Sequence, residues 1–72
     1  GPAPQVGLTQ RELDVLRGVA EGLINKQIAR RLGISEKTVK AHLSRVFQRL
    51  GVTDRTQAAL WAERNRVFDS PR

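Results

Sequence analysis

The stretch "NKQIARRLGISEKTVKAH" (residues 25–42) decides the fold, because two short segments with helical apolar spacing are separated only by the residues "GIS". Such a short connection predicts a sharp bend, with the second helix crossing the first at a large angle, as in a helix-turn-helix motif. Gly33 tolerates the positive φ that the turn requires. Ala29 supplies a small side chain where the helices cross. The motif is therefore predicted to consist of helices at 26–32 and 36–49.

Capping signals predict where the helices begin. Thr9 and Glu12 have the spacing of a capping box, and Asp54 with Gln57 has the same reciprocal pattern. Polar residues suited to cap the two central helices are Asn25 and Ser35. The chain is thus expected to be a compact all-α domain of four helices, at residues 10–21, 26–32, 36–49 and 55–64. No segment alternates with period 2, so no sheet is expected.

Apolar spacing predicts which face of each helix is buried. On the third helix one stripe consists of Val39, Leu43, Val46, Phe47 and Leu50. On the first helix the expected stripe is Leu13, Leu16, Val19 and Ala20, and on the second it is Ile28, Ala29 and Leu32. These stripes predict one small core shared by the helices.

Length and composition limit the class of protein. A chain of 72 residues is one small domain, too small for a deep catalytic cavity. It has no cysteine and a single histidine, so neither a disulfide framework nor a metal site is expected, and no cofactor is expected. No apolar run reaches the length of a membrane span. We interpret Gly1-Pro2 as a tag remnant, residues 1–7 as a flexible lead-in, 8–66 as the domain and 67–72 as a tail.

The positive charge is concentrated in one part of the chain. The formal net charge is +6. Seven basic residues and one acidic residue lie between Asn25 and Leu50, whereas the rest of the chain has six of each. Concentrated basic charge is typical of a contact with nucleic acid or an anionic membrane.

The exposed face of the third helix favours nucleic acid. A rotation of about 100° per residue points Lys37, Ala41, Ser44 and Gln48 away from the apolar stripe. Lys40 and Arg45 flank this face on opposite sides. Small residues in the middle permit close approach to the base edges of a major groove, and the flanking cations reach phosphates. A face serving only solubility would more often alternate acidic and basic residues.

The run from Leu8 to Arg64 resembles the C-terminal DNA-binding domain of the LuxR/GerE family of bacterial transcription regulators, which includes response regulators of the NarL type. The resemblance rests on "LTQREL", "GLINKQIA", "LGISEKTVKAHLSRVFQRLGV" and "RTQAA" in this order and spacing. It implies a four-helix domain whose third helix enters the major groove. It also implies dimers that bind inverted half-sites and whose two copies contact each other through the fourth helix. It also implies that this is one domain of a longer protein, whose N-terminal part is a receiver or ligand-sensing domain.

The resemblance also implies roles for particular residues. The base-reading positions of the family match Lys40, Ala41 and Ser44. The positions that meet phosphates match Asn25, Lys26, Lys37, Thr38 and Arg45. Each has a plainer interpretation: Lys40 as a solvated lysine, Ala41 as a good helix former, Asn25 as only a helix cap. The expected partners are double-stranded DNA and a second copy of the chain, with RNA polymerase as a further partner, in the bacterial cytoplasm.

The fourth helix presents two faces. Ala58 and Ala62 suit close packing on the domain, and the second face consists of Gln57, Leu60, Trp61 and Arg64. We interpret this second face as a dimer interface, while Trp61 completing the core is the alternative. Two other functional classes stay open: a module that binds an acidic protein partner, and a sigma-factor-like DNA reader within polymerase. An enzyme is rejected, because the chain has one His, no Cys, no phosphate-cradling glycine loop and no paired carboxylates on one face.

Overall fold

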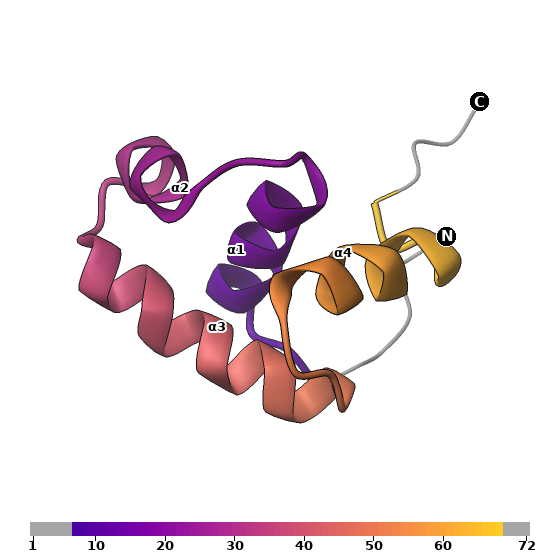
Figure 1. The fold of residues 1–72 in the computed structure, drawn as a ribbon. Coiled ribbons are helices and arrows are strands. Elements are labelled where there is room, and N and C mark those ends of the chain that lie inside the picture. The colour runs from indigo at the N-terminus through magenta and orange to yellow at the C-terminus, as the bar shows by residue number, and fades with distance from the viewer. Residues whose placement is uncertain (1–6, 69–72) are drawn as a thin grey trace.

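The computed structural model describes residues 7–68, which form four helices and no strand. The helices are α1 (Gln10–Ala20), α2 (Asn25–Leu32), α3 (Glu36–Leu50) and α4 (Arg55–Arg64). In Figure 1, α1 lies in the middle, with α2 and α3 on one side of it and α4 on the other. The predicted all-α fold is confirmed, and each predicted helix end lies within one residue of the observed one. The predictions for residues 1–6 and 69–72 lie outside the described residues.

Local capping fixes the starts of α1 and α3 as predicted. The Glu12 N–H donates to Thr9 Oγ1 over 3.1 Å, and the Thr9 N–H donates to Glu12 Oε1 over 2.9 Å. This capping box encloses the Glu12 side chain, so that the residue is only 3% exposed. Ser35 Oγ accepts from the Thr38 N–H over 3.0 Å at the start of α3. Both starts are therefore satisfied by residues within one turn.

The start of α4 confirms half of the predicted pair. Asp54 Oδ1 accepts from the Gln57 N–H over 2.9 Å, as a capping residue should. Gln57 Oε1 accepts from the Thr53 N–H over 3.0 Å instead of returning to Asp54. The reciprocal bond is thus displaced by one residue, because the extended backbone at Asp54 brings the preceding N–H within reach.

The prediction that Asn25 caps α2 is wrong. The helix already includes Asn25, and the capping position is Ile24, whose side chain offers no acceptor to the first turn. The local bonds there run from the Ile24 N–H to Gln27 Oε1 and from the Ile28 N–H to the Ile24 carbonyl, each over 3.0 Å. Asn25 Oδ1 instead accepts a hydrogen bond from Arg55 Nη1 of α4. A partner 30 residues away has replaced the local cap.

The turn between α2 and α3 has the predicted geometry. Gly33 has φ 68° and ψ 36°, the left-handed conformation that L side chains rarely adopt. The Ile34 N–H then donates to the Ala29 carbonyl over 3.0 Å, which closes the C-terminal end of α2. Ala29 is 6% exposed and lies at the crossing of the two helices. The helix-turn-helix motif is therefore present at the expected residues.

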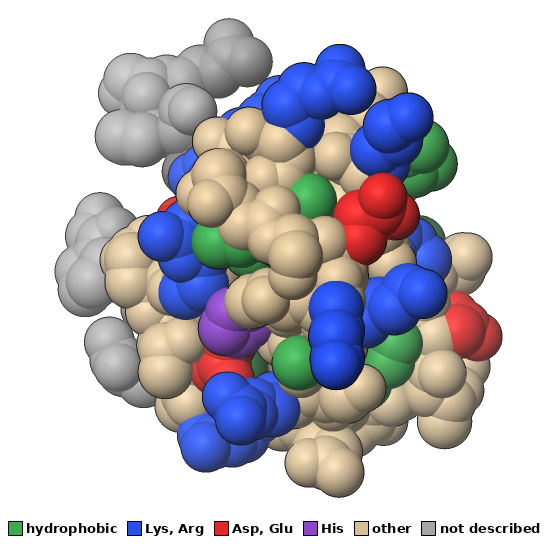
Figure 2. Space-filling view, turned by 90° about the vertical axis from the view of Figure 1, so that its left-hand side faces the viewer, with side chains coloured by type: hydrophobic (Ala, Val, Ile, Leu, Met, Phe, Trp, Pro, Cys, Tyr) green, Lys and Arg blue, Asp and Glu red, His purple; other side chains and the backbone are tan. Residues whose placement is uncertain are grey.

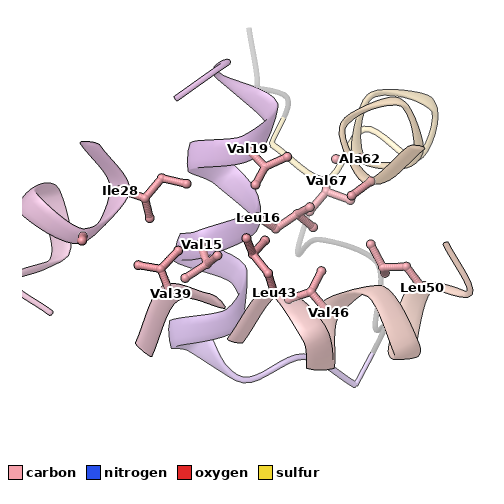
Figure 3. Close-up of a cluster of buried hydrophobic side chains, with 12 residues drawn as sticks. Val15, Leu16, Val19, Ile28, Val39, Leu43, Val46, Leu50, Ala62 and Val67 are labelled. Atoms are coloured by element: carbon pink, nitrogen blue, oxygen red, sulfur yellow. The ribbon is translucent and has the colours of Figure 1, made fainter. Parts of the chain in front are cut away.

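The core lies between α1 and α3 and is closed by α2 and α4, as Figure 3 shows. The stripe predicted for α3 is buried, apart from a half-buried Phe47. On α1 the prediction missed Val15, which is 0% exposed, whereas Ala20 is exposed. The buried face of α1, which packs against α2, α3 and α4, is thus rotated from the expected one.

Close contact between α1 and α2 depends on Gly18. A Cβ atom at this position would lie 2.7 Å from Ile28 Cγ1, which is too close for two carbon atoms. Ile28 is 1% exposed and has little room to move. Gly18 therefore lets α2 pack directly against the backbone of α1, which sets the position of the helix-turn-helix on the domain.

Packing continues beyond α4 to the last described residues. Val67 is 7% exposed and belongs to the core. Phe68 packs against it, and the Arg17 guanidinium of α1 lies 4.6 Å from the centre of the Phe68 ring. The segment after α4 thus covers the side of α1 that faces away from α2.

Candidate nucleic-acid interface

The outer face of α3 is available for a partner. Val39, Leu43 and Val46 anchor the helix to the core with exposures of 0–5%. This anchoring turns the opposite side chains outward, and all of the following are exposed: Lys37, Lys40, Ala41, Ser44, Arg45 and Gln48. The structure therefore gathers on one helix face the residues that the sequence placed there.

The cations of this region carry uncompensated charge. Within residues 7–68, ion pairs join Arg31 to Glu21, at 3.0 Å, and Arg11 to Asp14, at 3.9 Å. None of the predicted DNA-contacting cations takes part in them: Lys26, Lys37, Lys40 and Arg45. Figure 2 looks at the side with α2 and the start of α3, where Lys and Arg side chains are spread over the surface and acidic side chains show in a few separate places. This arrangement attracts a polyanion and leaves its cations free to pair with one.

Small polar groups occupy the middle of the α3 face. The Ser44 hydroxyl donates to the Lys40 carbonyl over 3.2 Å, so that in this conformation the oxygen turns its lone pairs outward. Thr38 Oγ1 lies 2.9 Å from Ser35 Oγ and belongs to the cap of α3, while the Thr38 side chain stays exposed. Ala41 adds no bulk beyond its methyl group. The centre is therefore low, and a flat or convex surface can approach it closely.

His42 takes the place between the outer face and the core. It is half-buried, while Leu43 is 5% exposed and points inward, as predicted. The His42 Nδ1 atom is buried and has no hydrogen-bond partner within the described residues. No group of three or more potential metal ligands occurs in the described part of the chain. We give His42 no role in the site.

The start of α2 adjoins the first residue of α4. Lys26 is exposed, as a phosphate contact requires, while Asn25 is half-buried and held by Arg55. Arg55 also donates through Nη2 to the Leu23 carbonyl. Sequence reasoning did not identify Arg55 as part of this region. No local pattern could have revealed it, because its two acceptors precede it by 30 and 32 residues.

The predicted dimer face of α4 is partly accessible. Gln57 and Arg64 are exposed, and Leu60 is 49% exposed. Trp61 is half-buried and packs against the core, so it serves the fold whatever else it contacts. Beside Leu60 lies a shallow hollow that also includes Ile24, whose side chain is 59% exposed. Ile24 is an apolar surface residue that the sequence analysis overlooked.

Among residues 7–68, no helix has the length and apolar character needed to cross a membrane.

Comparison with known proteins identifies the domain. Residues 6–62 match the model of the family described as bacterial regulatory proteins, luxR family. The transcriptional regulatory protein LiaR of Bacillus subtilis is 48% identical over 66 residues, which are 92% of this chain and 31% of LiaR. The chain thus spans about a third of the length of this relative.

Solved structures agree in fold. The response regulator ChrA of a heme-sensing two-component system superposes with a TM-score of 0.80 at 42% identity, covering 90% of this chain and 32% of ChrA. The DNA-binding domain of the response regulator ComA, solved in complex with the anti-activator RapF, gives 0.74 at 38% identity, covering 78% of this chain and 97% of that domain. Because the family model matches most of the chain, the protein belongs to the LuxR family of bacterial regulatory proteins and is a non-enzymatic helix-turn-helix DNA-binding domain.

Proposed function

We propose that this domain binds duplex DNA sequence-specifically, with α3 in the major groove, as the output domain of a bacterial transcription regulator. The observation that carries the proposal is the outer face of α3, where Ala41 and Ser44 form a low centre between the exposed cations Lys37, Lys40 and Arg45. An α-helix fits a major groove, and a low centre lets its side chains reach base edges.

Base reading is assigned to the centre of this face. Lys40 can donate to O6 and N7 of guanine, a contact that contributes about 1–3 kcal/mol of discrimination. Ala41 offers a methyl group that suits the methyl of thymine. Ser44 turns lone pairs outward, so it can accept from an exocyclic amino group of adenine or cytosine. These three residues would supply specificity for the DNA sequence, and the surrounding residues would supply affinity.

Phosphate binding is assigned to the edges of the surface. Lys37, Thr38 and Arg45 are exposed on α3, and at the start of α2 an exposed Lys26 follows the half-buried Asn25. Each phosphate neutralised by such a cation releases counterions, so binding weakens as salt rises. If about six phosphates are neutralised, log affinity should fall with log salt with a slope of about −5.

Selection of binding sites from randomised duplexes tests the proposal. At about 150 mM salt we expect an enriched inverted repeat, whose half-site spacing reports the geometry of the dimer. Lys40→Ala should lose most of its affinity for the selected site and little for random duplex. Equal losses on both would assign Lys40 to phosphate binding. Absence of enrichment, with no binding to any duplex, would overturn the proposal in favour of an acidic protein partner.

Dimerisation is assigned to the outer face of α4, formed by Gln57, Leu60, Trp61 and Arg64. Leu60 is the sharper probe because it is half-exposed, whereas Trp61 also packs on the core. Leu60→Ser should abolish cooperative binding to two half-sites and leave binding to one half-site intact. Unchanged cooperativity would contradict the interface. The longer protein would join this domain to a receiver or ligand-sensing domain and act with RNA polymerase on the chromosome, in the bacterial cytoplasm.

A further inference from the structure

We infer that Arg55, the first residue of α4, is a positioning residue for the DNA contact at the start of α2. The inference rests on the proposed function, because it concerns how Asn25 meets a phosphate. Arg55 belongs neither to the helix-turn-helix nor to the outer face of α4 that we assign to the dimer. Its role follows from what its guanidinium touches.

Arg55 joins two parts of the chain that are far apart in sequence. Its Nη1 atom donates to Asn25 Oδ1, and its Nη2 atom donates to the carbonyl of Leu23. Both bonds are partly buried, and Arg55 itself is half-buried. The planar guanidinium therefore holds the end of the α1–α2 connection, at Leu23, and the first residue of α2 in a fixed relative position.

This contact fixes the orientation of the Asn25 amide. A guanidinium has only donors, so the atom that faces Arg55 must be the carbonyl oxygen of the amide. The Asn25 amino group consequently points away from Arg55 and keeps its two donors for another partner. A phosphate oxygen accepts such bonds, and Lys26 beside it contributes a positive charge. Without Arg55 the amide can rotate and present its oxygen, which repels a phosphate.

Arg55 also leaves its own charge uncompensated. Its two acceptors are neutral, and within residues 7–68 no ion pair joins it to a carboxylate. Lysine at this position would keep the charge but lose the planar fork, so it could not hold both acceptors in the same geometry. Arg55→Lys therefore separates positioning from simple electrostatic attraction.

A double-mutant cycle on DNA affinity tests the inference. Wild type, Asn25→Ala, Arg55→Lys and the double variant are titrated with a fluorescent random-sequence duplex between about 50 and 200 mM salt. We expect each single variant to bind about three- to tenfold more weakly, which is the range of one lost hydrogen bond. The double variant should bind no more weakly than either single variant, because both changes remove the same contact.

Matched controls isolate the effect. Arg17→Lys replaces an arginine that stacks on Phe68 on another side of α1, and it should bind as wild type does. Lys37→Ala should weaken binding to the same extent in the wild-type and Arg55→Lys backgrounds. Additive losses in the cycle, or wild-type affinity of Arg55→Lys, would overturn the positioning role alone. Failure of the wild-type chain to bind any duplex would overturn the proposed function and this role together.

Asn25→Asp provides a second variant in case Asn25→Ala unfolds the start of α2. Aspartate can form a charged pair with Arg55, so the thermal midpoint should equal or exceed that of the wild type. The substitution removes the outward amino group and adds negative charge, so duplex affinity should fall more than tenfold at about 50 mM salt. Wild-type affinity of Asn25→Asp would contradict a donor role for Asn25 and with it the positioning role of Arg55.

Discussion

The two helices of the helix-turn-helix begin in different ways. The start of α3 is satisfied locally, since Ser35 Oγ accepts from the Thr38 N–H and Glu36 places negative charge in the first turn. The start of α2 has no side-chain cap and no acidic residue, and its first side chain is held by Arg55 from α4. The start of α3 is therefore held by residues adjacent in sequence, and the start of α2 by a residue of another helix.

This difference has a functional meaning under the proposed function. An uncapped N-terminus keeps N–H donors and a partial positive charge, which suit an anion such as a phosphate. A capped N-terminus has already used part of this capacity. Under the proposed function, the local cap would hold the start of α3 while its side chains meet a groove. The start of α2 would be left for a phosphate, with distant contacts holding that helix.

The largest effect should come from breaking the contact that holds α2 on the domain. Ile28 is 1% exposed, so Ile28→Ala should reduce the free energy of unfolding by about 2–5 kcal/mol. The matched control is Ile24→Ala at the same helix start, where the side chain is 59% exposed and the change should stay within about 0.5 kcal/mol. Urea unfolding followed by circular dichroism measures both. Equal losses would show that the start of α2 is not held by Ile28.

A smaller but more specific effect is expected at Gly18. Helix propensity alone predicts that Gly18→Ala stabilises α1 by about 1 kcal/mol. The added Cβ would meet Ile28 Cγ1 at 2.7 Å, so we expect a net destabilisation of about 1–3 kcal/mol. In the Ile28→Ala background the clash disappears, and the same substitution should become neutral or stabilising. Stabilisation of the otherwise unchanged chain by Gly18→Ala would show that α2 is not in direct contact with α1.

The features that could be predicted from the sequence are those set by neighbouring residues, and the features set by distant contacts could not be predicted. The caps at Thr9 and Ser35 and the turn at Gly33 depend on a few adjacent residues, and the structure confirms them. The apolar stripe of α3 was predictable because its buried residues form one helical stripe of apolar side chains. The buried face of α1 also contains Val15 and Gly18, and a glycine that lets α2 approach gives no apolar signal in the sequence.

The candidate site divides in the same way. The exposure of Lys40, Ala41 and Ser44 follows from the period of one helix. The orientation of Asn25 depends on Arg55, a residue 30 positions later, and no periodicity reports such a contact. The prediction of Asn25 as a cap was wrong for this reason: the residue type suits a cap, but a distant donor competes for its oxygen.

A stability cycle compares the two helix starts directly. Ser35→Ala should cost about 1 kcal/mol in the wild-type background and the same in the Arg55→Ala background, because its bond is local. Asn25→Ala should cost a comparable amount only while Arg55 is present, since Arg55 is its partner. Thermal unfolding at constant salt measures the cost of Ser35→Ala and of Asn25→Ala in each of the two backgrounds. A cost for Asn25→Ala that persists without Arg55 would mean that Asn25 supports α2 through its own backbone.

The smallest effect should come from giving α2 the acidic first turn that it lacks. Gln27 Oε1 already accepts from the Ile24 N–H, so Gln27→Glu should keep this bond and add a favourable interaction with the helix dipole. We expect a stabilisation of about 0.3–1 kcal/mol, largest at low salt. The added negative charge near the proposed phosphate should weaken duplex binding slightly, by about twofold, because the side chain turns back toward Ile24.

The matched control is Gln48→Glu on the exposed face of α3, where no stabilisation is expected but duplex binding should fall further. Equal effects of the two substitutions on stability would show that the start of α2 carries no open positive end, and the contrast between the two helix starts would then be one of sequence only.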